Sequence, residues 1–112
     1  MLKIYHNARC SKSRAALAYL LDQGYTPEVI NYLETPLTLA QLKALIAKSN
    51  LSLRQNLRTT EEVYAELNLE QADDEQLYAA VVQHPLLLNR PIVETEKGVR
   101  LGRPLEAIDD IL

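Results

Sequence analysis

The sequence predicts one α/β domain in which a βαβ unit is followed by a block of helices and then by a ββα unit. Three observations support this order. Short β-favouring runs lie near both ends of the chain, apolar residues in the middle recur at three- and four-residue spacing, and Gly or Pro marks several of the changes between these patterns. The 112 residues suffice for one core and contain no repeat, low-complexity segment or linker, so we expect a single domain over residues 1–112.

The predicted βαβ unit begins at the N-terminus. Residues 2–5 alternate in polarity and favour a first strand. A short loop then leads to a helix that Ser11 or Ser13 can cap and that Gly24 can end. Residues 28–32 favour a second strand, which runs parallel to the first if the two share a sheet.

The middle of the chain, about residues 36–84, is predicted to be a helical insertion. In a capping box, a Ser, Thr or Asp side chain and a Glu or Gln three residues later satisfy each other's backbone N–H groups at the start of a helix. Thr38–Gln41 has this form, Thr59–Glu62 offers another such box, and a further helix is expected to start at Asp73–Gln76. Ser52 can cap a further short helix.

The final segment returns to strand periodicity. Residues 91–94 favour a strand, Glu96–Gly98 a hairpin turn and residues 99–101 the returning strand. Pro104 suits the first position of a last helix that carries apolar residues at helical spacing. The order of elements is therefore βαβ, helices, then ββα.

Composition and charge exclude several classes of protein. Twelve basic and fifteen acidic residues give a net charge of −3, which argues against nonspecific nucleic-acid binding. No long apolar run exists, so we expect no membrane span, and basic residues interrupt the apolar core that a secretory signal would need. A single cysteine excludes an internal disulfide framework, a Cys-rich zinc site and an iron–sulfur cluster, and we expect a cytoplasmic protein.

Cys10 is the residue whose setting predicts chemistry. It follows a strand, precedes a helix and lies beside Arg9, Lys12 and Arg14 in a segment without acids. Helix N-terminal N–H groups and nearby cations lower the pKa of a thiol, so a thiolate nucleophile is expected rather than a buried structural cysteine. Ser13 stands where a Cys-x-x-Cys motif would have its second cysteine, so any covalent adduct must be resolved by an external thiol.

Three arginines are candidates for binding an anion. Arginine presents a planar fork of donors that suits tetrahedral oxyanions. Arg58 lies near a predicted helix end, Arg90 just before a strand and Arg103 after the hairpin. Spacing alone does not show that they converge, and taken singly each reads most simply as a surface arginine.

Five motifs in order then point to a family. They are His6-Asn7-Ala8-Arg9-Cys10-Ser11-Lys12-Ser13-Arg14, Asn31–Pro36, Gln83–Pro85, Asn89–Val93 and Arg100–Pro104. Together they resemble the glutaredoxin-coupled arsenate reductase (ArsC) family, in a short single-domain branch, and they span essentially the whole chain. Ala8 stands where the family commonly has proline, and Gly102 where it has a non-essential cysteine.

The resemblance implies a thioredoxin-like fold with a helical insertion between its halves. It also implies an arsenate reductase in which the Cys10 thiolate attacks arsenate and His6 helps to keep that thiol ionised. Arg58, Arg90 and Arg103 would bind the oxyanion. Ser13, Arg14 and Pro91 would support the site, with a cis peptide bond between Arg90 and Pro91.

The implied reaction depends on external thiols. Glutathione would attack the Cys10 adduct, arsenite would leave, and glutaredoxin would resolve the mixed disulfide between protein and glutathione. No metal and no bound organic cofactor is needed, and the family is largely monomeric, so we expect a monomer. We also expect that alanine at any of the three arginines weakens arsenate turnover while leaving the titration of Cys10 largely intact, and that His6→Ala raises the pKa of Cys10.

Two other functions remain open from the sequence. A general glutathione-dependent thiol oxidoreductase acting on mixed disulfides would use the same thiolate but would not need the arginines. A non-enzymatic redox regulator of the Spx type, which binds RNA polymerase, shares the fold. Such a regulator usually carries Cys-x-x-Cys, whereas this chain has Ser13.

Overall fold

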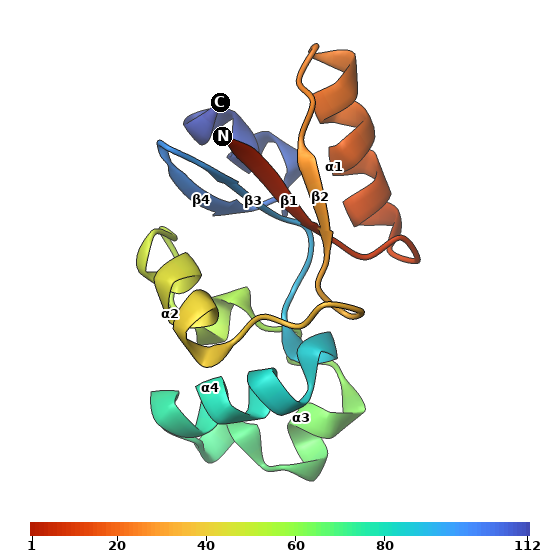
Figure 1. Ribbon diagram of the computed structural model, residues 1–112. Helices are drawn as coiled ribbons and strands as arrows, with labels where there is room; N and C mark the ends of the chain where they lie inside the picture. Colours follow the sequence, from red (N-terminus) through yellow and green to blue (C-terminus); the bar gives the residue numbers. More distant parts are fainter.

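A four-stranded mixed sheet forms the centre of the computed structural model, which describes all 112 residues (Figure 1). The strands are β1 (Leu2–His6), β2 (Glu28–Asn31), β3 (Ile92–Thr95) and β4 (Gly98–Leu101), in the order β2-β1-β3-β4. β1 pairs parallel with β2 and antiparallel with β3, and β3 pairs antiparallel with β4. The predicted βαβ and ββα halves are thus joined through the β1–β3 pair.

Helix α1 (Ser11–Asp22) connects the two parallel strands as predicted. Gly24 follows its end with φ of 90°, the left-handed conformation for which glycine is favoured. The prediction that Ser11 or Ser13 caps the helix is wrong. Cys10 occupies the N-cap position, and the Ser13 side chain is fully buried and turned toward His6.

The insertion contains three α-helices and several short 3₁₀ turns. A capping box at Thr38 starts α2, as predicted, and α4 starts at the predicted place with a capping box at Asp73. The predicted box at Thr59 is wrong, because α3 begins after Glu61, whose carboxylate lies against Arg58 instead of capping the helix. The elements are α2 (Leu39–Ala47), η1 (Arg54–Asn56), α3 (Glu62–Glu66), η2 (Leu69–Gln71), α4 (Asp74–Gln83) and η3 (Pro85–Leu87).

The sheet separates two hydrophobic clusters, because alternate residues of a strand point to opposite faces. Ile4 and Val93 face α1 and the C-terminal 3₁₀ helix η4 (Leu105–Ile111). Tyr5 and Ile92 face the insertion and belong to the larger cluster. Figure 1 shows α1 and the helices of the insertion on different sides of the sheet. The larger core therefore joins the insertion to the sheet.

The C-terminal segment follows the prediction with two differences. The last helix is 3₁₀ throughout and Pro104 is its N-cap rather than its first residue. The peptide bond between Arg90 and Pro91 is cis, as expected, and that between Arg103 and Pro104 is also cis, which was not expected. None of the helices combines the length and the apolar composition that a membrane span requires.

Candidate active site

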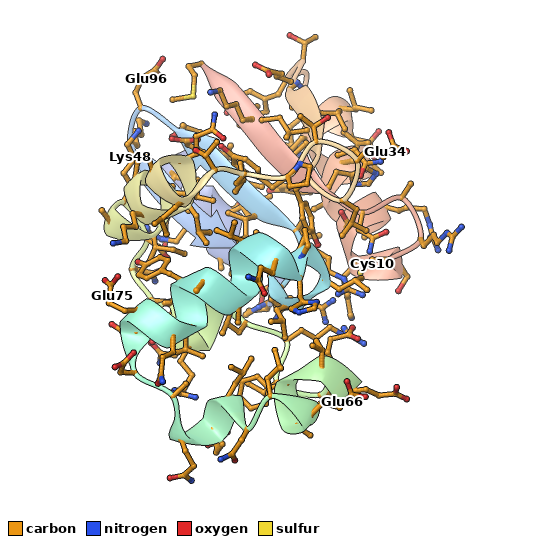
Figure 2. The ribbon with its side chains drawn as sticks, turned by 60° about the horizontal axis from the view of Figure 1, so that its bottom comes forward. Cys10, Glu34, Lys48, Glu66, Glu75 and Glu96 are labelled. Carbon is orange, nitrogen blue, oxygen red and sulfur yellow. The ribbon has the colours of Figure 1, made fainter.

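Cys10 lies where the loop after β1 turns into α1, on the side of the molecule where α1 approaches the insertion (Figure 2). Asn7, which is buried, shapes this loop: its carbonyl accepts the N–H of Cys10 at 3.0 Å and its side-chain Oδ1 accepts the N–H of Arg9 at 3.0 Å. Arg14 donates from Nη1 to the carbonyl of Ala8 at 2.9 Å. These bonds fix the backbone that presents the sulfur.

The pKa of Cys10 lies below the ordinary value of a thiol. Burial is the largest influence and raises the pKa, but it is outweighed by the groups that favour the thiolate. These are the backbone N–H groups of Ser13 and Lys12 and the hydrogen bonding and positive charge of Arg90. The sulfur makes no capping hydrogen bond of standard geometry, so the helix N-terminus acts mainly through electrostatics.

His6 contacts Ser13. His6 Nδ1 and Ser13 Oγ are 2.6 Å apart, and the N–H of Asn7 donates to the same Oγ at 3.1 Å. Burial, and then the charge of Arg14, lower the pKa of His6, so the neutral imidazole is favoured. The observed contacts thus connect His6 to the Cys10 loop through a fully buried hydroxyl.

Arg103 and Arg90 reach the sulfur from the other half of the fold. Arg103 donates from Nη2 to Cys10 Sγ at 3.3 Å and from Nε to the carbonyl of Arg90 at 2.7 Å. The N–H of Gly102 donates to the carbonyl of Pro91 at 2.8 Å, and a Cβ at Gly102 would lie only 2.9 Å from Pro91 Cγ. The glycine therefore permits the close approach that brings Arg103 beside Arg90.

Arg58 is brought to the same place by backbone pairing between two distant segments. The N–H of Arg58 donates to the carbonyl of Leu87 at 2.7 Å, and the N–H of Asn89 donates to the carbonyl of Asn56 at 2.8 Å. These bonds flank an antiparallel bridge between Leu57 and Leu88. Residues 56–58 and 87–89 are thereby held side by side, with Arg58 at the end of the first segment and Arg90 directly after the second.

The arginines carry buried donors without acceptors. Three guanidinium nitrogens are buried and make no hydrogen bond, namely Arg58 Nε, Arg90 Nε and Arg90 Nη1. The whole Arg90 residue is only 8% exposed. Buried N–H groups normally have acceptors, because leaving one unpaired costs about 1–3 kcal/mol. Guanidinium donors of this kind suit the oxygen atoms of a tetrahedral oxyanion. The arrangement can therefore bind such an anion next to the thiol of Cys10, whose pKa is lowered.

Two residues at the site were missed by sequence reasoning. Tyr32 is buried, its hydroxyl donates to the carbonyl of Leu88 at 3.2 Å, and burial raises its pKa to about 12. It lies within the motif Asn31–Pro36, which is the one signal that could have identified it. Glu61 contacts Arg58 and Arg90, but in the sequence its position indicated only the start of a helix.

The structure brings the predicted residues together in three contacting groups. His6, Ser13 and Arg14 support the Cys10 loop, Arg90 and Arg103 approach the sulfur, and Arg58 lies against Glu61. Pro91 follows Arg90 directly before β3. Because Arg90 and Arg103 both interact with the sulfur, their alanine variants are now expected to raise the pKa of Cys10, and only Arg58→Ala to leave its titration largely intact.

An open groove of about 940 Å³ flanks the Cys10 loop. Residues 7–9 form one wall, and the start of α3 and the end of α4 form others. Its rim is acidic, with Glu34 and Glu66 on either side of Cys10 in Figure 2. No group of three or more His, Cys, Asp or Glu side chains is arranged to hold a metal ion.

Fold and site together define a thioredoxin-like protein in which arginine side chains lie beside a single thiol. A model of the ArsC family matches residues 5–111. The chain therefore belongs to the ArsC family, as its motifs predicted.

Individual relatives support the same assignment. An arsenate reductase of Synechocystis is 47% identical, with 100% of this chain and 81% of that protein aligned. An arsenate reductase of Neisseria meningitidis is 45% identical, with 99% of this chain and 97% of that protein aligned. The solved arsenate reductase from Vibrio cholerae is 46% identical, with a TM-score of 0.95 over 99% of this chain and 97% of that one. These similarities confirm the predicted thioredoxin-like fold.

Proposed function

We propose that this protein is an arsenate reductase that uses the Cys10 thiolate as its nucleophile. The observation that carries the proposal is the set of buried guanidinium donors on Arg58 and Arg90 that make no hydrogen bond, beside a thiol of lowered pKa. Relatives of 45–47% identity that span the whole chain are named arsenate reductases, which supports arsenate as the oxyanion.

The first step joins the sulfur to arsenic. Arsenate binds to Arg58, Arg90 and Arg103, which offset the charge that otherwise repels a thiolate. The Cys10 thiolate attacks arsenic, a sulfur–arsenic bond forms, and one arsenate hydroxyl takes up a proton and leaves as water. Arsenic is still As(V) in this adduct.

The second step transfers the electrons. The thiolate of glutathione attacks the sulfur of Cys10, a sulfur–sulfur bond forms, and the sulfur–arsenic bond breaks with its electron pair going to arsenic. Arsenic is thereby reduced by two electrons to As(III), and after protonation it leaves as arsenite. The two sulfur atoms are oxidised to a mixed disulfide between Cys10 and glutathione.

The third step restores the thiolate. Cys10 is the only cysteine of the chain, and Ser13 cannot attack a disulfide. An external thiol must therefore resolve the mixed disulfide, and we assign this role to glutaredoxin, which attacks the glutathione sulfur and releases Cys10. Oxidised glutaredoxin is then reduced by further glutathione.

The arginines also separate this function from the two alternatives. A thiol oxidoreductase acting on protein mixed disulfides needs a thiolate but no cluster of buried guanidinium donors. A redox regulator needs a second thiol nearby to form a disulfide, and the chain has none. The oxyanion reductase uses both features of the site, the thiolate and the donors.

The experiment that tests the proposal follows arsenate-dependent consumption of NADPH in the presence of glutathione, glutaredoxin and glutathione reductase. We expect turnover that requires arsenate and is lost in Cys10→Ser, with omission of glutaredoxin slowing the reaction. Turnover that persists in Cys10→Ser, or wild-type protein that is inactive with arsenate, would overturn the proposal.

A further inference from the structure

Glu61 places a carboxylate on the arginines that are proposed to bind arsenate. Its Oε1 lies 2.9 Å from Arg58 Nε and 3.8 Å from Arg90 Nη1. The side chain is about one quarter exposed, so it lies at the rim of the site and also lines the open groove. A single carboxylate oxygen thus lies between two guanidinium groups.

The contacts of Glu61 leave the arginine donors available. Arg58 Nε is close to Oε1, but its N–H is not aligned for a hydrogen bond, and 3.8 Å is too long for one from Arg90. Both arginines can therefore still donate to a bound oxyanion. An oxyanion that takes up those donors must lie next to the carboxylate of Glu61.

We propose that Glu61 is a specificity-determining residue, which selects oxyanions that carry a hydroxyl group over oxyanions that carry none. An ionised carboxylate only accepts hydrogen bonds. Arsenate and phosphate keep at least one hydroxyl near neutral pH and can donate it to Glu61. Sulfate has no proton to donate, so its oxygen would face the carboxylate oxygen without a hydrogen bond between them.

Discrimination of this kind combines attraction and repulsion. The arginines attract every tetrahedral oxyanion, so they distinguish sulfate from arsenate poorly by themselves. A fixed acceptor beside them penalises the anion that lacks a donor, which is how specific sites reject close analogues. The inference rests on the proposed function, because it assumes that the arginines hold the oxyanion beside Cys10.

The test measures how phosphate and sulfate protect Cys10 from alkylation in Glu61→Gln and in the wild type. Phosphate and sulfate are used because neither is reduced, and the pH is mildly alkaline so that both are dianions of equal charge. In the wild type, phosphate is expected to protect at lower concentration than sulfate. We compare the sulfate concentration that gives half protection with the phosphate concentration that does so. Glu61→Gln is expected to lower this sulfate-to-phosphate ratio by about tenfold, because the amide can donate to sulfate.

Glu62→Gln is the matched control. Glu62 lines the same groove, is exposed and is not among the ion-pair partners of Arg58 and Arg90, so its substitution removes the same charge without changing the acceptor. The ratio is expected to stay at the wild-type value in this variant. Glu61→Ala provides a second variant. In it, protection of Cys10 by sulfate is expected to improve relative to protection by phosphate, as in Glu61→Gln.

Three results would overturn the proposal. They are equal protection by phosphate and sulfate in the wild type, an unchanged ratio in Glu61→Gln and Glu61→Ala, and an equal change of ratio in Glu62→Gln. None of them depends on arsenate turnover. Failure of the selectivity is thus distinguishable from failure of the reductase activity, which the NADPH assay reports separately.

Discussion

Cys10 owes its predicted reactivity to groups that lie on three separate parts of the chain. Backbone N–H groups of α1 favour the thiolate from one side, and Arg90 and Arg103 favour it from the other. The observed partner of His6 is Ser13, so a role of His6 in thiol ionisation stays a prediction. Substitutions at single residues are therefore expected to affect anion binding, ionisation of the Cys10 thiol and support of the Cys10 loop separately.

Arg58 and Arg103 are expected to differ in their effect on the thiol. Arg58→Ala and Arg103→Ala should each lower kcat/KM for arsenate by about 10²-fold, because each removes donors for the oxyanion. Only Arg103→Ala should also raise the pKa of Cys10, since Arg103 Nη2 lies 3.3 Å from the sulfur.

Steady-state kinetics and the pH dependence of Cys10 alkylation measure the two effects. Equal shifts of the alkylation profile in Arg58→Ala and Arg103→Ala would contradict the expectation that only Arg103 affects the pKa of Cys10.

His6 predicts a pH dependence of stability. Its pKa in the folded protein lies below the ordinary value of 6.5, chiefly through burial. The unfolded chain therefore binds more protons between those two values, so the free energy of unfolding falls as the pH drops below 6.5 and through the folded pKa. The contribution is fully present above 6.5.

Urea denaturation over a series of pH values measures this slope. His6→Asn, which keeps a hydrogen-bonding group near Ser13 but does not titrate, is expected to flatten it. An unchanged slope in His6→Asn would assign the acid sensitivity to other groups.

The secondary structure elements were largely predictable because their signals are local. The capping box at Thr38, the helix start at Asp73 and the glycine after α1 each depend on bonds within a few residues, and each formed as predicted. The errors at Ser13 and Thr59 have one cause. In both places a polar side chain near a helix start lies against a side chain outside that helix, and the capping pattern does not reveal such a contact. The partner is His6 for Ser13, and Arg58 and Arg90 for Glu61.

Tyr32 shows how one element positions another. Its hydroxyl donates to the carbonyl of Leu88, two residues before Arg90, at 3.2 Å. Tyr32→Phe is expected to lower the free energy of unfolding by about 1 kcal/mol, and kcat/KM with it, because the segment that carries Arg90 is held less firmly.

The exposed Tyr25 offers a matched control, since Tyr25→Phe should change stability by less than about 0.5 kcal/mol. Equal effects of the two substitutions, measured by chemical denaturation, would contradict this role of Tyr32.

At the scale of the whole molecule, the site lies between parts of the chain that the sequence separates widely. Arg58 and Arg103 are far from Cys10 along the chain, and their spacing carried no information about convergence. Only the resemblance to the ArsC family placed them together before the structure did. The backbone bonds between residues 56–58 and 87–89, which hold Arg58 in place, have no sequence signature of their own.

The larger core is expected to couple the insertion to the sheet in one unfolding transition. Leu77 on α4 is fully buried in it, and Leu77→Ala should cost about 2–5 kcal/mol of unfolding free energy. Leu67, which is 47% exposed, should tolerate alanine with a change below about 0.5 kcal/mol.

Urea denaturation followed by circular dichroism and by Cys10 alkylation tests the coupling. Coincident transitions are expected, since both halves of the fold form the site. Separate transitions would show that the insertion unfolds independently of the sheet.

A single-turnover reaction tests the central claim most directly. Wild-type protein is mixed with arsenate and glutathione without glutaredoxin, and the products are measured by mass spectrometry of the protein and by arsenite analysis. The account predicts one glutathione attached at Cys10 for each arsenite released, and neither product in Cys10→Ser. Arsenite released without glutathione on Cys10, or unmodified protein with no arsenite, would contradict it.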